Sequence, residues 1–347
     1  MAVGIGTERA TGGEPGPGTE RPGPAPGRPR AWRLPRSPKI IAGLALLAFF
    51  VLWAIIGPFV TPYSPDEIFA NSPVPLPPSG AHWLGTTSLQ QDVFSQLLVG
   101  GGDMLLVSFL AGVIATALSV VVGVTAGYVG GLADELLSML ANIFLVMPAL
   151  PLLVILFGFL GKSGSNDLFL IGLIISVTGW AWGARVLRAQ TLSLRNRDYV
   201  DSARIIGERR SRIIFTEILP NLTPIVASSF LFTVLYAVGT YTAMAFLGLV
   251  NPNWSWGGML FYAQGANAEV SGYWWWFIPP GLAVALLGTA LVLVNFGIDE
   301  FINPRLRAAG LTRRGRAGRD GRGGRTRARR SQQFALTPVV PAAGARP

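Results

Sequence analysis

Cysteine is absent from the 347 residues, histidine occurs once, and charged side chains make up only 13% of the chain. Without cysteine the chain has no disulfide, no cysteine-ligated metal site and no thiol nucleophile. The single histidine, His82, excludes a metal site built from several histidines. Soluble domains carry about 25% charged residues, so the low charge and the 50% hydrophobic content argue against a soluble enzyme.

Long stretches almost free of charge dominate the middle of the chain. A helix that crosses a bilayer needs about 20 apolar residues. The stretches predict an all-α integral membrane protein with six transmembrane helices, at 39–61, 104–128, 135–160, 167–188, 222–249 and 276–299. The third helix contains Pro148 and Pro151, which we expect to kink it.

Basic residues orient these helices. Seven Lys and Arg precede or open the first helix, eight Arg lie between the fourth and fifth, and twelve follow the last. The 62–103 loop and the 250–275 loop contain neither, and only Lys162 lies on their side. Because positive residues stay in the cytoplasm, we expect both termini inside, a 62–103 extracytoplasmic loop, and a helical membrane core over 104–307 with a cytoplasmic loop at 189–221.

The two ends of the chain differ from the apolar middle. Residues 1–38 are rich in proline, glycine and arginine, and residues 308–347 in arginine and glycine. Such composition predicts disordered cytoplasmic tails. An arginine-rich tail can bind nucleic acid, but a solvated tail attracted to the anionic lipid bilayer is the simpler interpretation, and we expect no nucleic-acid partner.

Acidic residues keep to the ends of the predicted helices. They are Asp103, Asp134, Glu135, Asp167, Asp299 and Glu300. Ion-coupled carriers usually hold such residues at membrane depth, so this class is disfavoured, and no embedded carboxylate pair exists for hydrolysis. Gly161-Lys162-Ser163 resembles the end of a phosphate-binding loop, but Leu156 replaces its first glycine. We expect no catalytic residue, metal or nucleotide site on this chain.

The loop between the fourth and fifth helices is the strongest candidate for a functional site. Asp198 is placed to cap a short helix, and Tyr199, Ala203 and Ile206 recur at helical spacing to form one apolar face. Gly207 is expected to end that helix, and a second short amphipathic piece follows until Leu219-Pro220 ends it. An exposed short helix with an apolar face and basic neighbours suits docking into a groove of a cytoplasmic partner.

This loop resembles the EAA loop of ABC-importer permeases, whose pattern is E-A-A-x-x-x-G followed at a fixed distance by L-P. Asp201, Ser202 and Ala203 stand at the E-A-A positions, and Gly207 and Leu219-Pro220 match the rest. In that family the loop forms a coupling helix that docks on the ATPase subunit. The resemblance implies ATPase-coupling roles for Tyr199, Asp201, Ser202, Ala203, Ile206, Gly207, Leu219 and Pro220.

A second segment, 82–100, is similar to the stretch before the second helix in the dipeptide/oligopeptide/nickel permease subfamily. That pattern reads L-G-T-D-x-x-G-R-D-x-x-S-R, and this chain departs from it with Gln90-Gln91 at Gly-Arg and Gln96 at the last Arg. The resemblance, over about residues 35–307, implies the second of two permeases in a bacterial plasma-membrane importer. Its implied partners are a homologous permease, two cytoplasmic ABC ATPase subunits that bind ATP and magnesium, and an extracytoplasmic solute-binding protein; its implied cargo is peptides or a similar small polar solute.

Polar and small residues follow stripes on two of the predicted helices. Ser229, Thr233, Tyr236 and Thr240 recur at spacings of 4, 3 and 4, which suits either a pathway lining or hydroxyls bonded within and between helices. The small residues of the 104–128 helix, Gly112, Thr116, Ser119, Gly123 and Gly127, favour close helix packing. The aromatic residues near 254–276 are expected to anchor at the membrane interface.

Two rival functions remain open at this stage. A passive channel or secondary carrier would work without a soluble ATPase. A membrane scaffold would use the loop only to recruit a partner and would move no solute.

Overall fold

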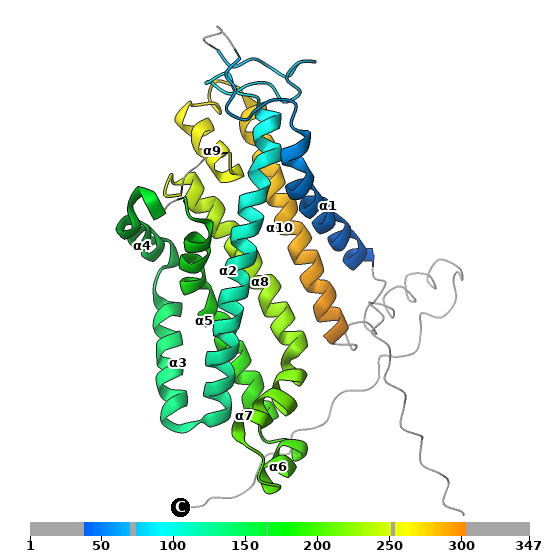
Figure 1. The fold of residues 1–347 in the computed structure, drawn as a ribbon, viewed down its shortest axis with the longest axis vertical. Helices are drawn as coiled ribbons and strands as arrows, with labels where there is room; N and C mark the ends of the chain where they lie inside the picture. The colour runs from blue at the N-terminus through cyan, green and yellow to red at the C-terminus, as the bar shows by residue number, and fades with distance from the viewer. Residues whose placement is uncertain (1–37, 70–73, 165, 251–253, 303–347) are drawn as a thin grey trace, which may run out of the picture. The chain divides into compact units, whose positions relative to one another are not determined.

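The computed structural model describes residues 38–69, 74–164, 166–250 and 254–302, which belong to one compact unit of the chain. Nearly all of the predicted tails, 1–38 and 308–347, lies outside these residues. The helices are α1 (Pro38–Val60), α2 (Val93–Val129), α3 (Gly131–Val146), α4 (Ala149–Gly164), α5 (Leu168–Leu194), α6 (Asp198–Ile205), α7 (Arg210–Ile213), the π-helix η1 (Ile214–Ile218), α8 (Leu219–Phe246), α9 (Trp256–Gly265) and α10 (Trp274–Ile302) (Figure 1).

The long helices confirm an all-helical membrane protein. Among the described residues, five helices are long and apolar enough to cross a bilayer: α1, α2, α5, the continuous run from α7 to α8, and α10. α3 and α4 make a sixth span only when they are taken together as one bent pair. The described part of the chain therefore has five to six candidate spans. One end of the bundle carries α6 and the opposite end carries α9 (Figure 1).

The break between α3 and α4 follows from proline. The two helices meet at an angle of 92°, and Met147, just before Pro148, adopts an extended conformation with ψ of 130°. A residue before proline is disfavoured in the α region, because the proline ring clashes with it. The predicted kink is confirmed, and it is sharp enough to split the expected 135–160 helix into two.

α2 begins much earlier than its apolar stretch predicts. It starts at Val93, so the last part of the predicted 62–103 loop is helical. Asp92 caps the helix by accepting the Ser95 N–H at 2.7 Å. The glycine run after Val99 conceals this first part in the sequence, but Gly100 and Gly101 lie against Trp254 and Trp256, where a larger side chain would not fit.

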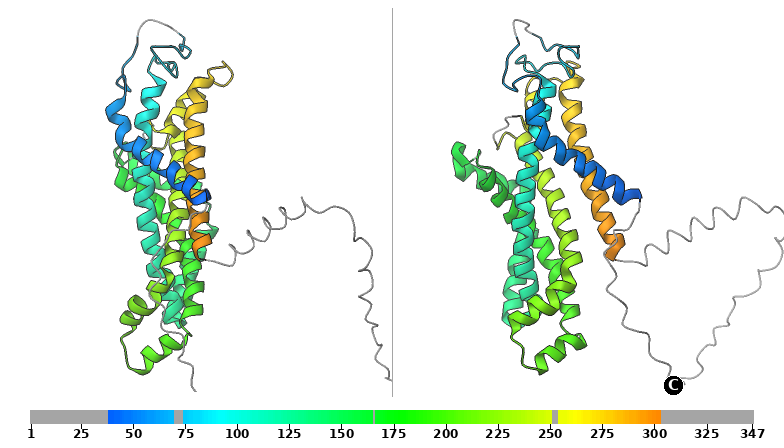
Figure 2. Two further views of the ribbon diagram at one scale, coloured as in Figure 1. Left: turned by 90° about the vertical axis from the view of Figure 1, so that its right-hand side faces the viewer. Right: turned by 45° about the vertical axis from the view of Figure 1, so that its right-hand side comes forward.

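α2 and α5 pack along their length through small residues. A Cβ on Gly123 would overlap the backbone oxygen of Ala184, and one on Gly127 would come within 2.7 Å of Thr191. The Ser119 hydroxyl lies within 2.6 Å of the Trp180 carbonyl. The packing role predicted for the small-residue stripe is therefore confirmed. α1 lies obliquely across α10 (Figure 2), where Gly43 of α1 meets Leu293.

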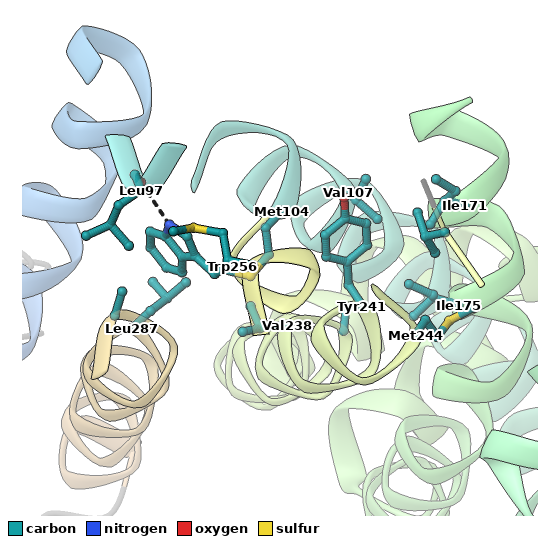
Figure 3. Close-up of a cluster of buried hydrophobic side chains, with 14 of the residues drawn as sticks. Leu97, Met104, Val107, Ile171, Ile175, Val238, Tyr241, Met244, Trp256 and Leu287 are labelled. Carbon is teal, nitrogen blue, oxygen red and sulfur yellow. Dashed lines mark hydrogen bonds between the residues drawn. The ribbon is translucent and has the colours of Figure 1, made fainter. Parts of the chain in front are cut away.

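The largest buried cluster among the described residues lies toward the α9 end and contains three tryptophans, Trp256, Trp275 and Trp276. The Trp256 indole N–H donates to the Leu97 carbonyl at 2.9 Å, which fixes α9 to α2 (Figure 3). Trp275 and Trp276 are also buried. The expectation that these tryptophans anchor at the membrane interface is wrong for all three, because they fill the chain's own core; Trp274 is half exposed.

Candidate functional site

α6 is a short helix held at one end of the bundle, beyond the ends of α2 and α5 (Figure 1). The predicted cap is wrong by one residue. Arg197 occupies the N-cap position without a side-chain cap, and Asp198 is the first helical residue. Asp198 and Asp201 both lie in the first turn, where negative charge interacts favourably with the helix dipole.

Gly207 ends α6 as predicted. Its φ is 84°, in the left-handed region that favours glycine. The Gly207 N–H donates to the Arg204 carbonyl at 3.0 Å, and the Glu208 N–H donates to the Ala203 carbonyl at 3.1 Å. These two bonds form a Schellman motif, which satisfies carbonyls that the helix end leaves unpaired.

One side of α6 is attached to the end of α2. Val200 is fully buried in a cluster with Tyr128 of α2 and Leu222 of α8, and Ala203 packs against the same cluster. The Arg204 guanidinium lies 5.3 Å from the centre of the Tyr128 ring, a distance at which a cation is attracted to the ring face. These contacts were not predicted, because they depend on which helix end approaches the loop.

The opposite side of α6 is exposed among the described residues, and it carries three large hydrophobic side chains beside the exposed polar residues Asp198, Asp201 and Ser202. Tyr199 is 38% exposed, Ile205 86% and Ile206 79%. The predicted single face of Tyr199, Ala203 and Ile206 is therefore wrong: Ala203 turns toward the bundle, while the other two point outward. Ile205 joins the outward group, and the sequence pattern missed it because it is one residue off the predicted stripe.

Polar groups on α6 bond locally. The Ser202 hydroxyl donates to the Asp198 carbonyl at 2.8 Å, and Asp201 pairs with Arg204 at 3.0 Å. Both partners of this ion pair are well exposed, so it contributes roughly 0–1 kcal/mol. The shape of α6 thus depends more on Val200 and the Gly207 cap than on its charges.

The chain returns to the bundle without a break in the helix. The prediction that Leu219-Pro220 ends the second piece is wrong, because α7, η1 and α8 form one continuous helix. Pro220 has no N–H and its ring would clash with the carbonyl four residues earlier; the wider π turn at Ile214–Ile218 lies at that point and accommodates it. Ile213 and Ile218 are buried in the cluster that also holds Val200.

Two residues of the polar stripe on α8, Thr233 and Tyr236, lie against Gly179 of α5. The Tyr236 hydroxyl donates to the Thr178 hydroxyl at 2.9 Å, and the Thr233 hydroxyl donates to the Ser229 carbonyl at 2.8 Å. Ser229, Thr233 and Thr240 are buried within the chain. These contacts favour the interpretation of hydroxyls bonded within and between helices.

The loop before α2 explains two departures from the subfamily pattern. Gln90 keeps a positive φ of 59° at the glycine position, and its side-chain amide donates to the Val74 carbonyl at 2.8 Å. Gln91 and Gln96 stand at the two arginine positions, and the Gln96 amide donates to the Gln91 side-chain oxygen at 2.8 Å. The two replacements therefore contact each other directly through neutral side chains.

His82 has a packing role in this loop. Its Nδ1 lies 3.0 Å from Asp92 Oδ1, with both side chains buried, and its ring contacts Tyr63 and Phe69. Among the described residues, no group of three potential metal ligands is close enough to hold an ion.

A recess of about 400 Å³ lies between this loop and α9. Its wall contains amides, aromatic rings and one carboxylate, from Gln91, Gln96, Trp254, Tyr262, Trp276 and Asp66. It thus offers a polar and aromatic lining without any cation, at the end of the bundle opposite α6.

Most of the chain matches known protein families and proteins. Residues 119–308 match the family described as "Binding-protein-dependent transport system inner membrane component", and residues 30–78 match "N-terminal TM domain of oligopeptide transport permease C". The chain is 32% identical over 280 residues to the dipeptide transport system permease protein DppC of Bacillus subtilis, covering 80% of this chain and 85% of that protein.

Two further relatives give the same picture. The oligopeptide transport system permease protein OppC of Mycobacterium bovis is 31% identical over 278 residues, covering 80% of this chain and 94% of that protein. The probable D,D-dipeptide transport system permease protein DdpC of Escherichia coli is 30% identical over 277 residues, covering 79% of this chain and 90% of that protein.

Proposed function

The chain belongs to the family of inner-membrane permeases of binding-protein-dependent transport systems, in its oligopeptide/dipeptide permease C group. From this premise we propose that it carries di- or oligopeptides inward under the control of a separate ATPase. It is a multi-pass, non-catalytic membrane subunit. Peptides are the cargo named for the relatives. The wall of the outer recess, with amides and aromatic rings and no cation, suits a ligand whose backbone is recognised while its side chains vary.

The observation that carries the proposal is the division of α6 into two sides. Val200 and Ala203 attach it to the bundle, while Tyr199, Ile205 and Ile206 remain exposed on a helix of eight residues. Exposed apolar residues grouped on one surface mark a protein-interaction site. This surface is the proposed docking site for an ATPase subunit, with Gly207, Leu219 and Pro220 setting the path of the loop around it.

The distribution of basic residues indicates on which side of the membrane the α6 loop lies. The α6 end carries most of the arginines that lie between the described spans, whereas the 62–103 and 250–275 loops have no Lys or Arg. The rule that positive residues stay inside supports a cytoplasmic α6 and cytoplasmic termini. The recess next to α9 then faces the outside, where a solute-binding protein would deliver the ligand.

The contacts between α6 and the bundle indicate how a movement of α6 would be transmitted to the membrane-spanning helices. α6 contacts Tyr128 at the end of α2, and η1 and α8 share the cluster around Val200. α2 in turn packs closely on α5. A shift of α6 driven by closure of two ATPase subunits would move α2 and α8 together, and with a homologous permease opposite, the central passage would open alternately to each side.

The test is the loss of ATPase association when the exposed surface of α6 is made polar. The change is Ile205→Asp combined with Ile206→Asp. Burying one such side chain contributes about 1.5–3 kcal/mol, so the double variant should weaken association at least about a hundredfold. The measurement is co-purification from membranes in mild detergent, followed by ATP-dependent peptide uptake in vesicles.

The matched control is Val270→Asp, which places one aspartate at an 89% exposed aliphatic residue on the opposite end of the bundle. It should leave ATPase association unchanged. Undiminished association in the double variant would contradict the docking surface. Peptide uptake that continues without any ATPase would instead support a channel or secondary carrier.

A further inference from the structure

A second cavity, of about 270 Å³, lies between α2, α3 and α5 toward the α6 end. Its wall is formed by small and apolar residues from the three helices, Val122, Ala126, Leu137, Ala141 and Ala184, and by Gly123. Its polar wall is formed by Ser138, Asn142, Arg185 and Arg188. The cavity thus combines an apolar wall with two guanidinium groups.

The two arginines differ in how far their charge is already neutralised. Arg188 donates from Nε and Nη2 to the two carboxylate oxygens of Asp134, at 2.5 and 2.7 Å. Arg185 donates from Nη2 to the neutral Asn142 side-chain oxygen at 2.8 Å, and within the described part of the chain no carboxylate forms an ion pair with it. Because a guanidinium has five N–H donors, Arg185 keeps both a net charge and free donors.

The height of these arginines in the bilayer follows from the length of α5. α5 has 27 residues, which gives about 40 Å at 1.5 Å per residue, whereas the hydrocarbon core is about 30 Å thick. If the start of α5, capped by Asp167, lies at one edge of the bilayer, the hydrocarbon core ends roughly 20 residues further along the helix. Arg185 and Arg188 therefore lie near the boundary where lipid phosphates are found.

We propose that this cavity binds an anionic phospholipid, with the headgroup phosphate at Arg185 and part of an acyl chain against the wall formed by Ala126, Ala141 and Ala184. A phosphate oxygen accepts charge-assisted hydrogen bonds from a guanidinium, and basic pockets between membrane helices on the cytoplasmic side suit anionic headgroups. The cavity lies next to the Asp134–Arg188 pair that joins α3 to α5, so the bound lipid would also support the position of α3. This site is separate from the ATPase surface and does not depend on the cargo.

The experiment measures lipids that stay bound to the complete transporter complex. The complex is reconstituted in nanodiscs of phosphatidylcholine with a minority of phosphatidylglycerol, released into detergent, and examined by native mass spectrometry. Phosphatidylglycerol should be enriched over its share in the disc. Arg185→Gln should lower its retention about fivefold, the factor for one basic residue near an anionic surface, while Arg185→Lys should keep most of it.

The control is Lys39→Gln, which removes another exposed cation, from the start of α1, and should leave retention unchanged. Equal retention in Arg185→Gln and Lys39→Gln would overturn the proposal. So would displacement of the lipid by inorganic phosphate alone, which would show a phosphate site without a lipid. The chain has no cysteine, so Ala141→Cys adds a single thiol at the cavity wall. Cross-linking of that thiol to the partner permease would show that protein covers the cavity, and would also overturn the proposal.

Discussion

The cap of α6 offers the sharpest test of how this loop keeps its shape. Gly207 has a φ of 84°, and a Cβ added there would meet no atom within 4 Å. The Gly207→Ala variant therefore has no steric clash with the rest of the chain, and its cost is only that of placing a side chain in the left-handed region. That cost is about 1–2 kcal/mol for an ordinary residue and less for asparagine, which adopts this conformation more readily.

The expected result is a local loosening of the helix end. A cost of 1–2 kcal/mol corresponds to about a 5- to 30-fold change in an equilibrium. The Glu208 amide, which donates to the Ala203 carbonyl, should exchange with deuterium faster by that factor in Gly207→Ala, and by less in Gly207→Asn. ATP-dependent uptake should fall in the same order if α6 is the coupling element.

The control is Gly158→Ala. Gly158 lies in α4, a Cβ there also meets nothing within 4 Å, and its φ is not in the left-handed range. This variant should change neither Glu208 exchange nor uptake. Unaltered exchange in Gly207→Ala, or a larger effect in Gly207→Asn than in Gly207→Ala, would refute the argument from backbone conformation.

Four further single substitutions test contacts outside α6. Gly123→Leu should destabilise the folded chain by about 1–3 kcal/mol or more, because a Cβ already overlaps the Ala184 carbonyl; thermal unfolding in detergent measures it. Gln91→Ala and Gln96→Ala should each cost about 0.5–1.5 kcal/mol, and a double-mutant cycle should show non-additive losses because the two amides bond each other. Asp92→Ala should cost more than the about 0.5–2 kcal/mol of the lost α2 cap, because it also leaves buried His82 Nδ1 without its partner; faster amide exchange in the first turn of α2 measures the loss of the cap.

Local signals in the sequence predicted the parts of the structure that depend on neighbouring residues. Gly207 predicted the end of α6 because a Schellman motif needs only one residue with positive φ and two adjacent N–H groups. Pro148 likewise predicted the break between α3 and α4, because the proline ring restricts the backbone conformation of the residue directly before it. Both expectations are confirmed by backbone geometry.

Contacts between distant segments were not predictable in this way. The inward side of α6 is set by Tyr128, about 70 residues earlier in the chain, so periodicity alone placed Ala203 on the outward docking face, although it packs against the bundle. The first part of α2, which contains Gly100 and Gly101, was assigned to a loop because the charge-free stretch begins only after Asp103. Their small size is required by Trp256, a residue that only the folded chain brings near.

The cluster beneath α6 gives a physical reason to treat the loop as a rigid element. Val200 of α6, Ile213 of α7, Ile218 of η1 and Leu222 of α8 are all buried together against Tyr128 of α2. Moving α6 alone would expose these side chains, and each fully buried aliphatic residue contributes about 1.5–3 kcal/mol relative to exposure. A force applied at Ile205 and Ile206 is therefore expected to displace the ends of α2 and α8 with α6, rather than to bend the loop between them.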